Sequence, residues 1–161
     1  MSTGPRRGEH GFTYLELVAT AAILMILASA IMPMAKLTRK RQKEIELRRE
    51  LRIIRTAIDD YKKLADTPGK LGPSDIKLGS EGYPPTLEIL VEGVNVVGDA
   101  SGVKKKFLRR IPSDPMTNST EWGMRCYQDD HDSDSWCGSN VWDVYSQSQG
   151  EALDGTKYAD W

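Results

Sequence analysis

One carboxylate stands at the start of a long apolar run, and no other residue of the chain needs a chemical partner more. Glu16 is followed by 19 uncharged residues, Leu17 to Ala35. As a helix with about 1.5 Å of rise per residue, this run would be roughly 28 Å long, close to the thickness of a hydrocarbon core. A lone acid in such a segment is costly unless it is paired, so Glu16 is predicted to have a function.

The two cysteines are the second candidate for chemistry. Cys126 and Cys137 lie 11 positions apart, separated by polar residues, and the sequence has no C-x-x-C motif. The two histidines, His10 and His131, are too scattered to complete a zinc site. A disulfide between the cysteines is predicted if the domain is exported, because the bond needs an oxidising compartment. The alternative is two unrelated free thiols.

An acidic stretch between the cysteines is a candidate cation site. It reads Asp129-Asp130-His131-Asp132-Ser133-Asp134. Acids that alternate at 130, 132 and 134 are typical of the start of an EF-hand loop, but Ser135 replaces the glycine and Val141 replaces the final glutamate of that motif. An exposed acidic loop is therefore the favoured interpretation.

The charge distribution divides the chain into a basic and an acidic part. Residues 36–63 hold 11 Lys/Arg and 5 Asp/Glu, whereas residues 64–161 hold 9 Lys/Arg and 16 Asp/Glu. The basic cluster Lys36 to Lys43 could bind anionic lipid headgroups or form ion pairs between subunits. No binding of nucleic acid is expected, because the chain as a whole is not basic and the cluster has no interleaved aromatic residues.

One long helix is predicted to position these residues. It runs from about Thr13 to Leu64 and ends before Pro68-Gly69. Pro33 lacks an N–H, so it should kink or locally melt the helix. Beyond Pro33, apolar residues recur at spacings of three and four, which predicts a core face against a globular domain. These residues are Leu47, Leu51, Ile54, Ile58 and Tyr61.

The rest of the chain predicts a small domain, which makes the fold class α+β. A loop over residues 64–82 precedes a short helix, Leu87 to Val91, with Gly93 after its end. Two short strands with β-branched and aromatic residues, Gly123 to Gln128 and Asn140 to Ser146, form an antiparallel hairpin. The cysteines lie near facing ends of this hairpin, which suits a cross-strand bridge.

The polar leader before the apolar run suggests a partner for Glu16. Residues 1–11 include Arg6 and Arg7 and no hydrophobic stretch, unlike a secretory signal peptide. A cut after Gly11 would remove the leader, keep the helix and leave a positive α-amino group on Phe12. The amine of one molecule could then meet Glu16 of a neighbour, which neutralises both charges in an apolar bundle.

These residues resemble a known processing signal. The segment Gly11-Phe12-Thr13-Tyr14-Leu15-Glu16 is similar to the class III signal of type IV pilins and type II secretion pseudopilins, which also commonly carry a proline at the place of Pro33. The resemblance implies cleavage after Gly11 and N-methylation of Phe12 by a prepilin peptidase. It implies four segments: a leader (1–11), a transmembrane and assembly helix (12–35), an amphipathic stalk helix (36–66) and a periplasmic domain (67–161).

Later motifs are similar to those of the major, G-type pseudopilin. They are Gly82-Tyr83-Pro84, the run from Leu108 to Pro115, Trp122-Gly123 and the run from Asp143 to Ser146. The insertion of Met116 to Glu121 and the cysteine pair depart from that pattern. The resemblance implies a calcium site in the C-terminal loop, since Ca²⁺ prefers carboxylate, hydroxyl and carbonyl oxygens. The expected ligands are Ser148, Leu153, Asp154, Thr156 and Asp160.

The resemblance implies a structural protein and not an enzyme. The expected function is a subunit of a type II secretion pseudopilus, a homopolymer built in the periplasm from inner-membrane subunits. Its expected partners are the prepilin peptidase, minor pseudopilins and an inner-membrane assembly platform. The alternatives are a surface type IV pilin, used for adhesion, motility or DNA uptake, and a tip pseudopilin, one type of which lacks the acid found here at Glu16. The positive-inside rule conflicts with this orientation, because more Lys/Arg follow the apolar run than precede it.

Overall fold

The computed structural model describes residues 11–72, 79–99 and 102–161, and it describes no side chains for residues 30–33. Most of the predicted leader, residues 1–10, therefore lies outside the described residues. The chain divides into two compact units, Met1–Arg39 and Lys40–Trp161. Each unit is considered by itself.

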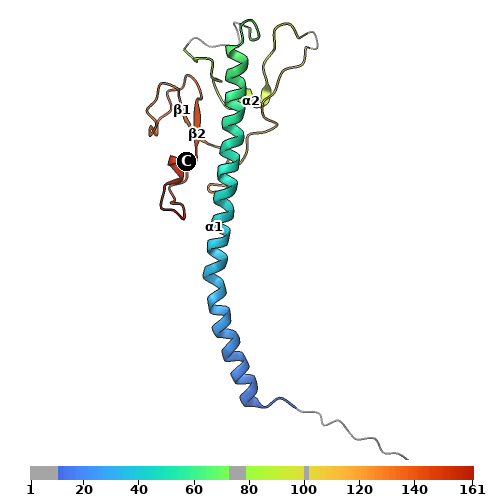
Figure 1. Cartoon of the computed structure of the whole chain (residues 1–161), viewed down its shortest axis with the longest axis vertical. Helices are drawn as coiled ribbons and strands as arrows, with labels where there is room; N and C mark the ends of the chain where they lie inside the picture. The colour runs from blue at the N-terminus through green and yellow to red at the C-terminus, as the bar shows by residue number, and fades with distance from the viewer. Residues whose placement is uncertain (1–10, 73–78, 100–101) are drawn as a thin grey trace, which may run out of the picture. The chain divides into compact units, whose positions relative to one another are not determined.

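Helix α1 spans Tyr14–Asp66 and passes through both units (Figure 1). It begins where the backbone N–H of Glu16 donates to the hydroxyl of Thr13, 3.3 Å away, and that of Leu17 donates to the Thr13 carbonyl. It ends just before Pro68 and Gly69, where Gly69 has a φ of +72°. The predicted bounds are confirmed to within two residues.

The local melting considered for Pro33 is not observed, because α1 continues through position 33 without a break. A proline removes one backbone hydrogen bond of a helix, and the bonds of the neighbouring turns can hold the helix together. The prediction that Pro33 locally melts the helix is therefore wrong.

The predicted apolar stripe is the core of the second unit. Leu47, Leu51, Ile54, Ile58 and Tyr61 are all at most 2% exposed. They pack with buried residues from the rest of the unit, including Leu90, Val141 and Val144. Tyr61 also meets the ring of Phe107, with 5.5 Å between the ring centroids. The interpretation of the stripe as a core face is confirmed.

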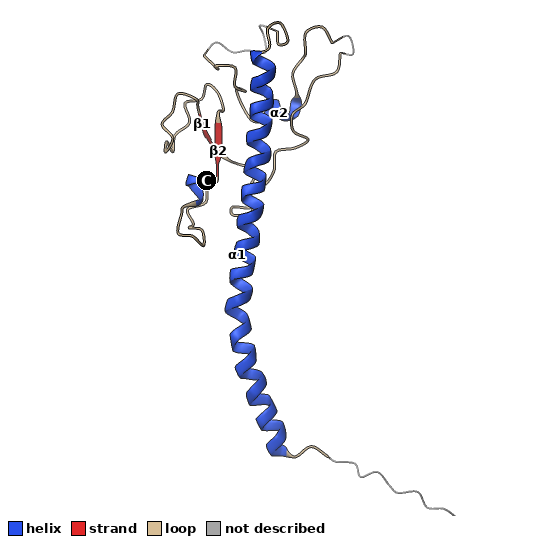
Figure 2. Cartoon of the chain, in the orientation of Figure 1, coloured by secondary structure: helices blue, strands red, loops and turns tan. Residues whose placement is uncertain are grey.

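Beyond α1 the unit consists mostly of loops (Figure 2). Helix α2 spans Glu88–Glu92, one residue later than predicted, and stops at Gly93. Gly93 has a φ of +85°, and a Cβ there would lie 2.7 Å from the carbonyl oxygen of Lys105. Glycine is therefore required where the chain turns to pair Val94 with Lys105.

The predicted hairpin is present with shorter strands. Strand β1 (Gly123–Arg125) pairs antiparallel with β2 (Asp143–Tyr145), and Met124 lies opposite Val144. Pairing stops because the Asn140 side chain, not a strand backbone, accepts the N–H of Tyr127. The Tyr145 ring lies directly over Gly123, where any Cβ would clash with it. A 3-10 helix, η1 (Tyr158–Asp160), follows near the C-terminus.

Truncating the core face should destabilise the second unit far more than truncating the exposed face of the same helix. Among the described residues, all buried hydrophobic side chains lie from Leu47 onward, so a fragment beginning at Lys40 keeps the whole core. In that fragment, Ile54→Ala should lower the free energy of unfolding by about 2–5 kcal/mol, because Ile54 is 0% exposed. Ile45→Ala is the matched control, with Ile45 64% exposed and an expected change within about 0.5 kcal/mol.

Urea denaturation measures both values. Equal losses for the two variants would contradict the assignment of the core face.

Candidate functional site

The apolar part of α1 has no cover within its own unit. Leu24, Met25, Ile26 and Leu27 are consecutive and each is at least 57% exposed, although successive residues of a helix point in directions about 100° apart. All sides of the helix are thus open. This helix is long and apolar enough to cross a membrane, and none of its apolar window is buried.

Glu16 is exposed in the first turn of α1, next to an exposed Phe12. Its backbone N–H is held by Thr13, but its carboxylate has no hydrogen bond or ion pair within residues 11–72, 79–99 and 102–161. Thr13 and Glu16 have the spacing of a capping box, and the structure shows one half of it, the bond from the Glu16 N–H to the Thr13 hydroxyl. The cap and the charge are separable by mutation, because the cap uses the Thr13 side chain and an ion pair would use the Glu16 carboxylate.

A second carboxylate, Glu44, joins α1 to the C-terminal loop. It is buried, and its Oε1 accepts hydrogen bonds from the Leu153 backbone N–H at 2.8 Å and from the Tyr158 hydroxyl at 3.1 Å. The sequence analysis missed this contact. The burial of Glu44 could have been predicted from its position, because it lies three residues before Leu47 and so belongs to the core face of the helix.

The pKa of Tyr158 is raised to about 12, mainly because the phenol is buried. The hydrogen bond to Glu44 and the negative charge of Glu44 add to the shift. The neutral phenol is therefore favoured in the folded state, where it can donate to the carboxylate.

Two arginines of α1 hold the C-terminal residues against the same helix. Arg55 donates to both carboxylate oxygens of Asp143, at 2.6 and 3.2 Å, and to the carbonyl oxygen of Trp161 at 2.6 Å. Arg48 lies over the Trp161 ring, 4.0 Å from its centroid. In Figure 1 the strands and the C-terminal segment accordingly lie along one side of this part of α1.

The predicted calcium ligands are only partly brought together. Asp154 Oδ1 accepts hydrogen bonds from the N–H and the hydroxyl of Thr156, at 3.0 and 2.6 Å, and these bonds lower the pKa of Asp154. Its Oδ2 lies 3.5 Å from Arg48. The Ser148 hydroxyl accepts the Gly150 N–H, and Leu153 meets Glu44 through its own N–H.

Asp160 belongs to a different part of the surface. It lines a hollow together with Asp132, Asp134 and Lys157. Among the described residues, hydrogen bonds connect Asp154 to only one other predicted ligand, Thr156, and both of its carboxylate oxygens already have protein partners. Calcium binding by these residues stays a prediction, since Ca²⁺ takes six to eight oxygens from carboxylates, carbonyls and waters.

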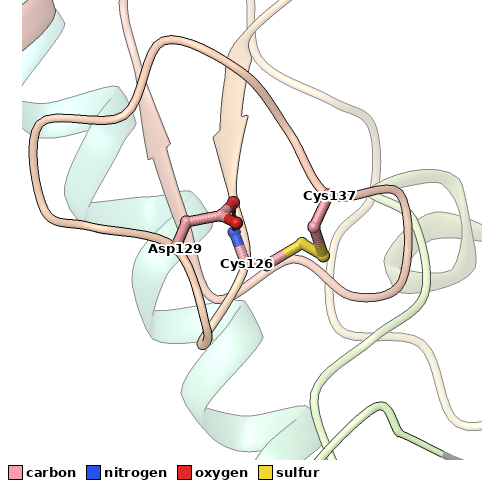
Figure 3. Close-up of side chains that lie close together, drawn as sticks. All are labelled: Cys126, Asp129 and Cys137. Atoms are coloured by element: carbon pink, nitrogen blue, oxygen red, sulfur yellow. Dashed lines mark hydrogen bonds between the residues drawn. A yellow bond between two sulfur atoms is a disulfide. The ribbon is translucent and has the colours of Figure 1, made fainter.

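The predicted disulfide is present. Cys126 and Cys137 are bonded, with their Cα atoms 5.9 Å apart (Figure 3). With Asp129 they make up the one group of three potential metal-binding side chains found in the part of the chain that the structure describes. Both sulfurs are bonded to each other and neither is a free thiolate, so the group is not suited to a metal. Asp129 instead accepts the Cys126 N–H at 2.7 Å.

Comparison with known proteins gives no match: no family model, no curated protein and no solved structure is similar to this chain. What the chain does is therefore inferred from its own residues.

The Tyr158–Glu44 contact should make stability fall at high pH. The pKa of Tyr158 is raised from about 10 to about 12, so the contribution is complete below pH 10 and is lost as the pH rises from 10 to 12. The difference in unfolding free energy between the wild-type fragment and Tyr158→Phe should shrink over this window by roughly 2 kcal/mol. Glu44→Gln should reduce that change without abolishing it, because burial is the larger cause. A difference that stays constant to pH 12 would contradict the contact.

The calcium prediction is tested by removing calcium. If the C-terminal loop binds Ca²⁺, chelation should lower the melting temperature of the fragment by at least about 5 °C, and Asp154→Asn should abolish that shift. Asp132→Asn is the control, because Asp132 belongs to the rival acidic loop. No shift on chelation would mean that Arg48 and Thr156 satisfy Asp154 without an ion.

Proposed function

We propose that this chain is the structural subunit of a type II secretion pseudopilus. In this proposal a prepilin peptidase removes residues 1–11 and methylates Phe12, and the processed chains polymerise into a periplasmic filament whose growth drives protein export. The chain acts by assembly and not by catalysis.

The observation that carries the proposal is the exposed apolar surface of α1 that begins with Glu16. Exposed apolar patches larger than a few hundred Å² are rare on monomers and mark surfaces for lipid or protein. A membrane would cover this surface before assembly, and the same helices of neighbouring copies would cover it in a filament. Both environments are apolar, so both explain why no part of the first unit packs on it.

The Glu16 carboxylate, which has no partner among the described residues, favours the second environment as the functional one. Breaking a buried ion pair by removing one partner typically costs about 3–5 kcal/mol, and charges within a membrane are likewise paired. The α-amino group of Phe12, exposed by cleavage after Gly11, is a cation at the right end of a neighbouring helix. Pairing with Glu16 would fix the stagger between adjacent copies, because any other stagger leaves both charges unpaired.

The second unit supports export. A disulfide persists in the periplasm and is rare in the cytosol, so the Cys126–Cys137 bond favours a C-terminal unit outside the cytoplasm. This outweighs the positive-inside rule, which counts the cations that follow the apolar run and would favour the opposite orientation.

A surface type IV pilin is the second candidate. It would have the same cleavage site, the same apolar helix and the same use of Glu16, so none of these features separates the two. The motifs of the C-terminal unit, its small size and the calcium loop that the resemblance implies favour the pseudopilin. Filaments confined to the cell envelope would support the pseudopilin, and long surface fibres would support the pilin.

Substitution of Glu16 tests the assembly role. Glu16→Gln keeps the Thr13 cap but removes the charge, so this variant should still be cleaved after Gly11 and should lose filament assembly by about a hundred-fold or more, the equivalent of about 3–5 kcal/mol for one unpaired charge. The amount of polymer in isolated cell envelopes, with immunoblots for processed chain, measures both steps.

The matched variant is Thr13→Ala, which removes the side chain that caps the helix and leaves the charge of Glu16 in place. It should assemble close to normally. Equal loss in both variants would mean that Glu16 acts only at the helix start, and normal filaments from Glu16→Gln would remove the pairing argument.

A further inference from the structure

The second unit has an arginine-rich cleft where α1 meets the C-terminus. The cleft measures about 500 Å³ and is lined by Arg48, Leu51, Arg52, Arg55, Asp59 and Trp161. The three arginines are spaced by four and three residues, so they share one face of the helix. Guanidinium groups beside an aromatic ring suit carboxylates, which they can bind through two parallel hydrogen bonds.

The three arginines differ in what they already bind. Arg55 is occupied by Asp143 and the Trp161 carbonyl. Arg48 rests on the Trp161 ring and meets Asp154 at 3.5 Å, in a pair whose side chains are more than half exposed. The guanidinium of Arg52 is exposed and has no ion pair or hydrogen bond within the described ranges. Arg52 is therefore the guanidinium of the cleft that has no acidic partner among the described residues, and Asp59 is the one acidic side chain in the lining.

The same unit has an acidic loop whose carboxylates lack basic partners within the described residues. Asp130, Asp132 and Asp134 are exposed, and none of them forms an ion pair within the described part of the chain. The Cys126–Cys137 bond closes the loop, and the hydrogen bond from the Cys126 N–H to Asp129 holds its first turn. The loop is thus presented in a restricted conformation, which lowers the entropy lost on binding.

We propose that the acidic loop of one copy, Asp130 to Asp134, binds the arginine cleft of the next copy. The loop and the cleft have no residue in common, so each copy offers one of each. A contact between two different patches is heterologous, and it continues from copy to copy in an open helical filament. The inference rests on the proposed function, because it needs copies of this chain to assemble.

Charge complementarity argues for a second copy as the occupant. Opposite surface charges steer subunits together and penalise like-charge contacts. The basic residues 36–63 and the acidic residues 64–161 of one sequence are complementary to each other. An anionic lipid headgroup or an acidic segment of another protein would use the same arginines, and the experiment below distinguishes them.

The test is charge reversal in the full-length chain in its native membrane. Arg52→Glu and Asp132→Arg should each reduce filament yield by about ten-fold or more, and the double variant Arg52→Glu/Asp132→Arg should recover most of the yield because the pair is restored with its signs exchanged. Arg49→Glu and Glu88→Lys are the controls. Both residues are exposed, and neither lines the cleft nor lies in the loop.

Photo-cross-linking reads the contact directly. A photoreactive phenylalanine analogue in place of His131 leaves the aspartates intact, and two differently tagged copies in one cell reveal bonds between molecules. The expected product joins position 131 of one copy to a peptide of the other that contains Arg52 or Trp161. Products that join position 131 to lipid or to another protein, or to no partner, would overturn the proposal.

The outcomes separate this inference from the proposed function. If Glu16→Gln abolishes filaments but Arg52→Glu, Asp132→Arg and the double variant all assemble like the wild type, the loop–cleft contact is wrong and the pseudopilus proposal stands. If the double variant assembles no better than the single variants, the two residues do not pair. Retention of the disulfide and of protease resistance in each variant shows that the fold is intact.

Discussion

The structure depends on a helix surface that the chain does not cover by itself. The described residues of the first unit expose apolar side chains around α1, and among them the carboxylate of Glu16 has no partner. Water is an unfavourable environment for the apolar residues, and lipid is an unfavourable one for the acid. A bundle of identical helices resolves both problems at once, provided that a cation from a neighbour reaches Glu16. The proposed assembly follows from this one constraint.

The second unit uses the same helix to build its hydrophobic core. Its small domain is mostly loops, which by themselves bury little apolar surface, so α1 supplies the core stripe from Leu47 to Tyr61. Polar contacts then hold the C-terminal residues to α1: Glu44 meets the Leu153 N–H and the Tyr158 hydroxyl, and Arg55 meets Asp143 and Trp161. Helix α1 thus supplies both the exposed apolar surface of the first unit and the core face of the second.

Elements that depend on the spacing of apolar residues, or on a proline or glycine that ends a helix, could be predicted from the sequence. The ends of α1, the core stripe, the short helix and the hairpin follow from residue spacing, proline and glycine, and the structure confirms them. Contacts between distant residues could not be predicted, because Arg55 and Asp143 lie 88 positions apart. The calcium ligands were implied by a resemblance in the C-terminal loop, whereas in the structure Asp154 bonds to Thr156 and Arg48, and Asp160 lines a hollow with Asp132 and Asp134. The roles proposed for Gly11, Phe12 and Glu16 could not be tested on a single chain, because they depend on processing and on neighbouring copies.

The central claim is that cleavage creates the partner of Glu16, and the mass of the mature N-terminus tests it most directly. The chain isolated from the membranes of its own cells should begin at Phe12, one methyl group heavier than the unmodified residue. Its N-terminal peptide should then retain Glu16 and the whole apolar segment. A mature chain that still begins with the leader, or one that has been cut after the apolar segment as a secretory signal peptide is, would contradict the account.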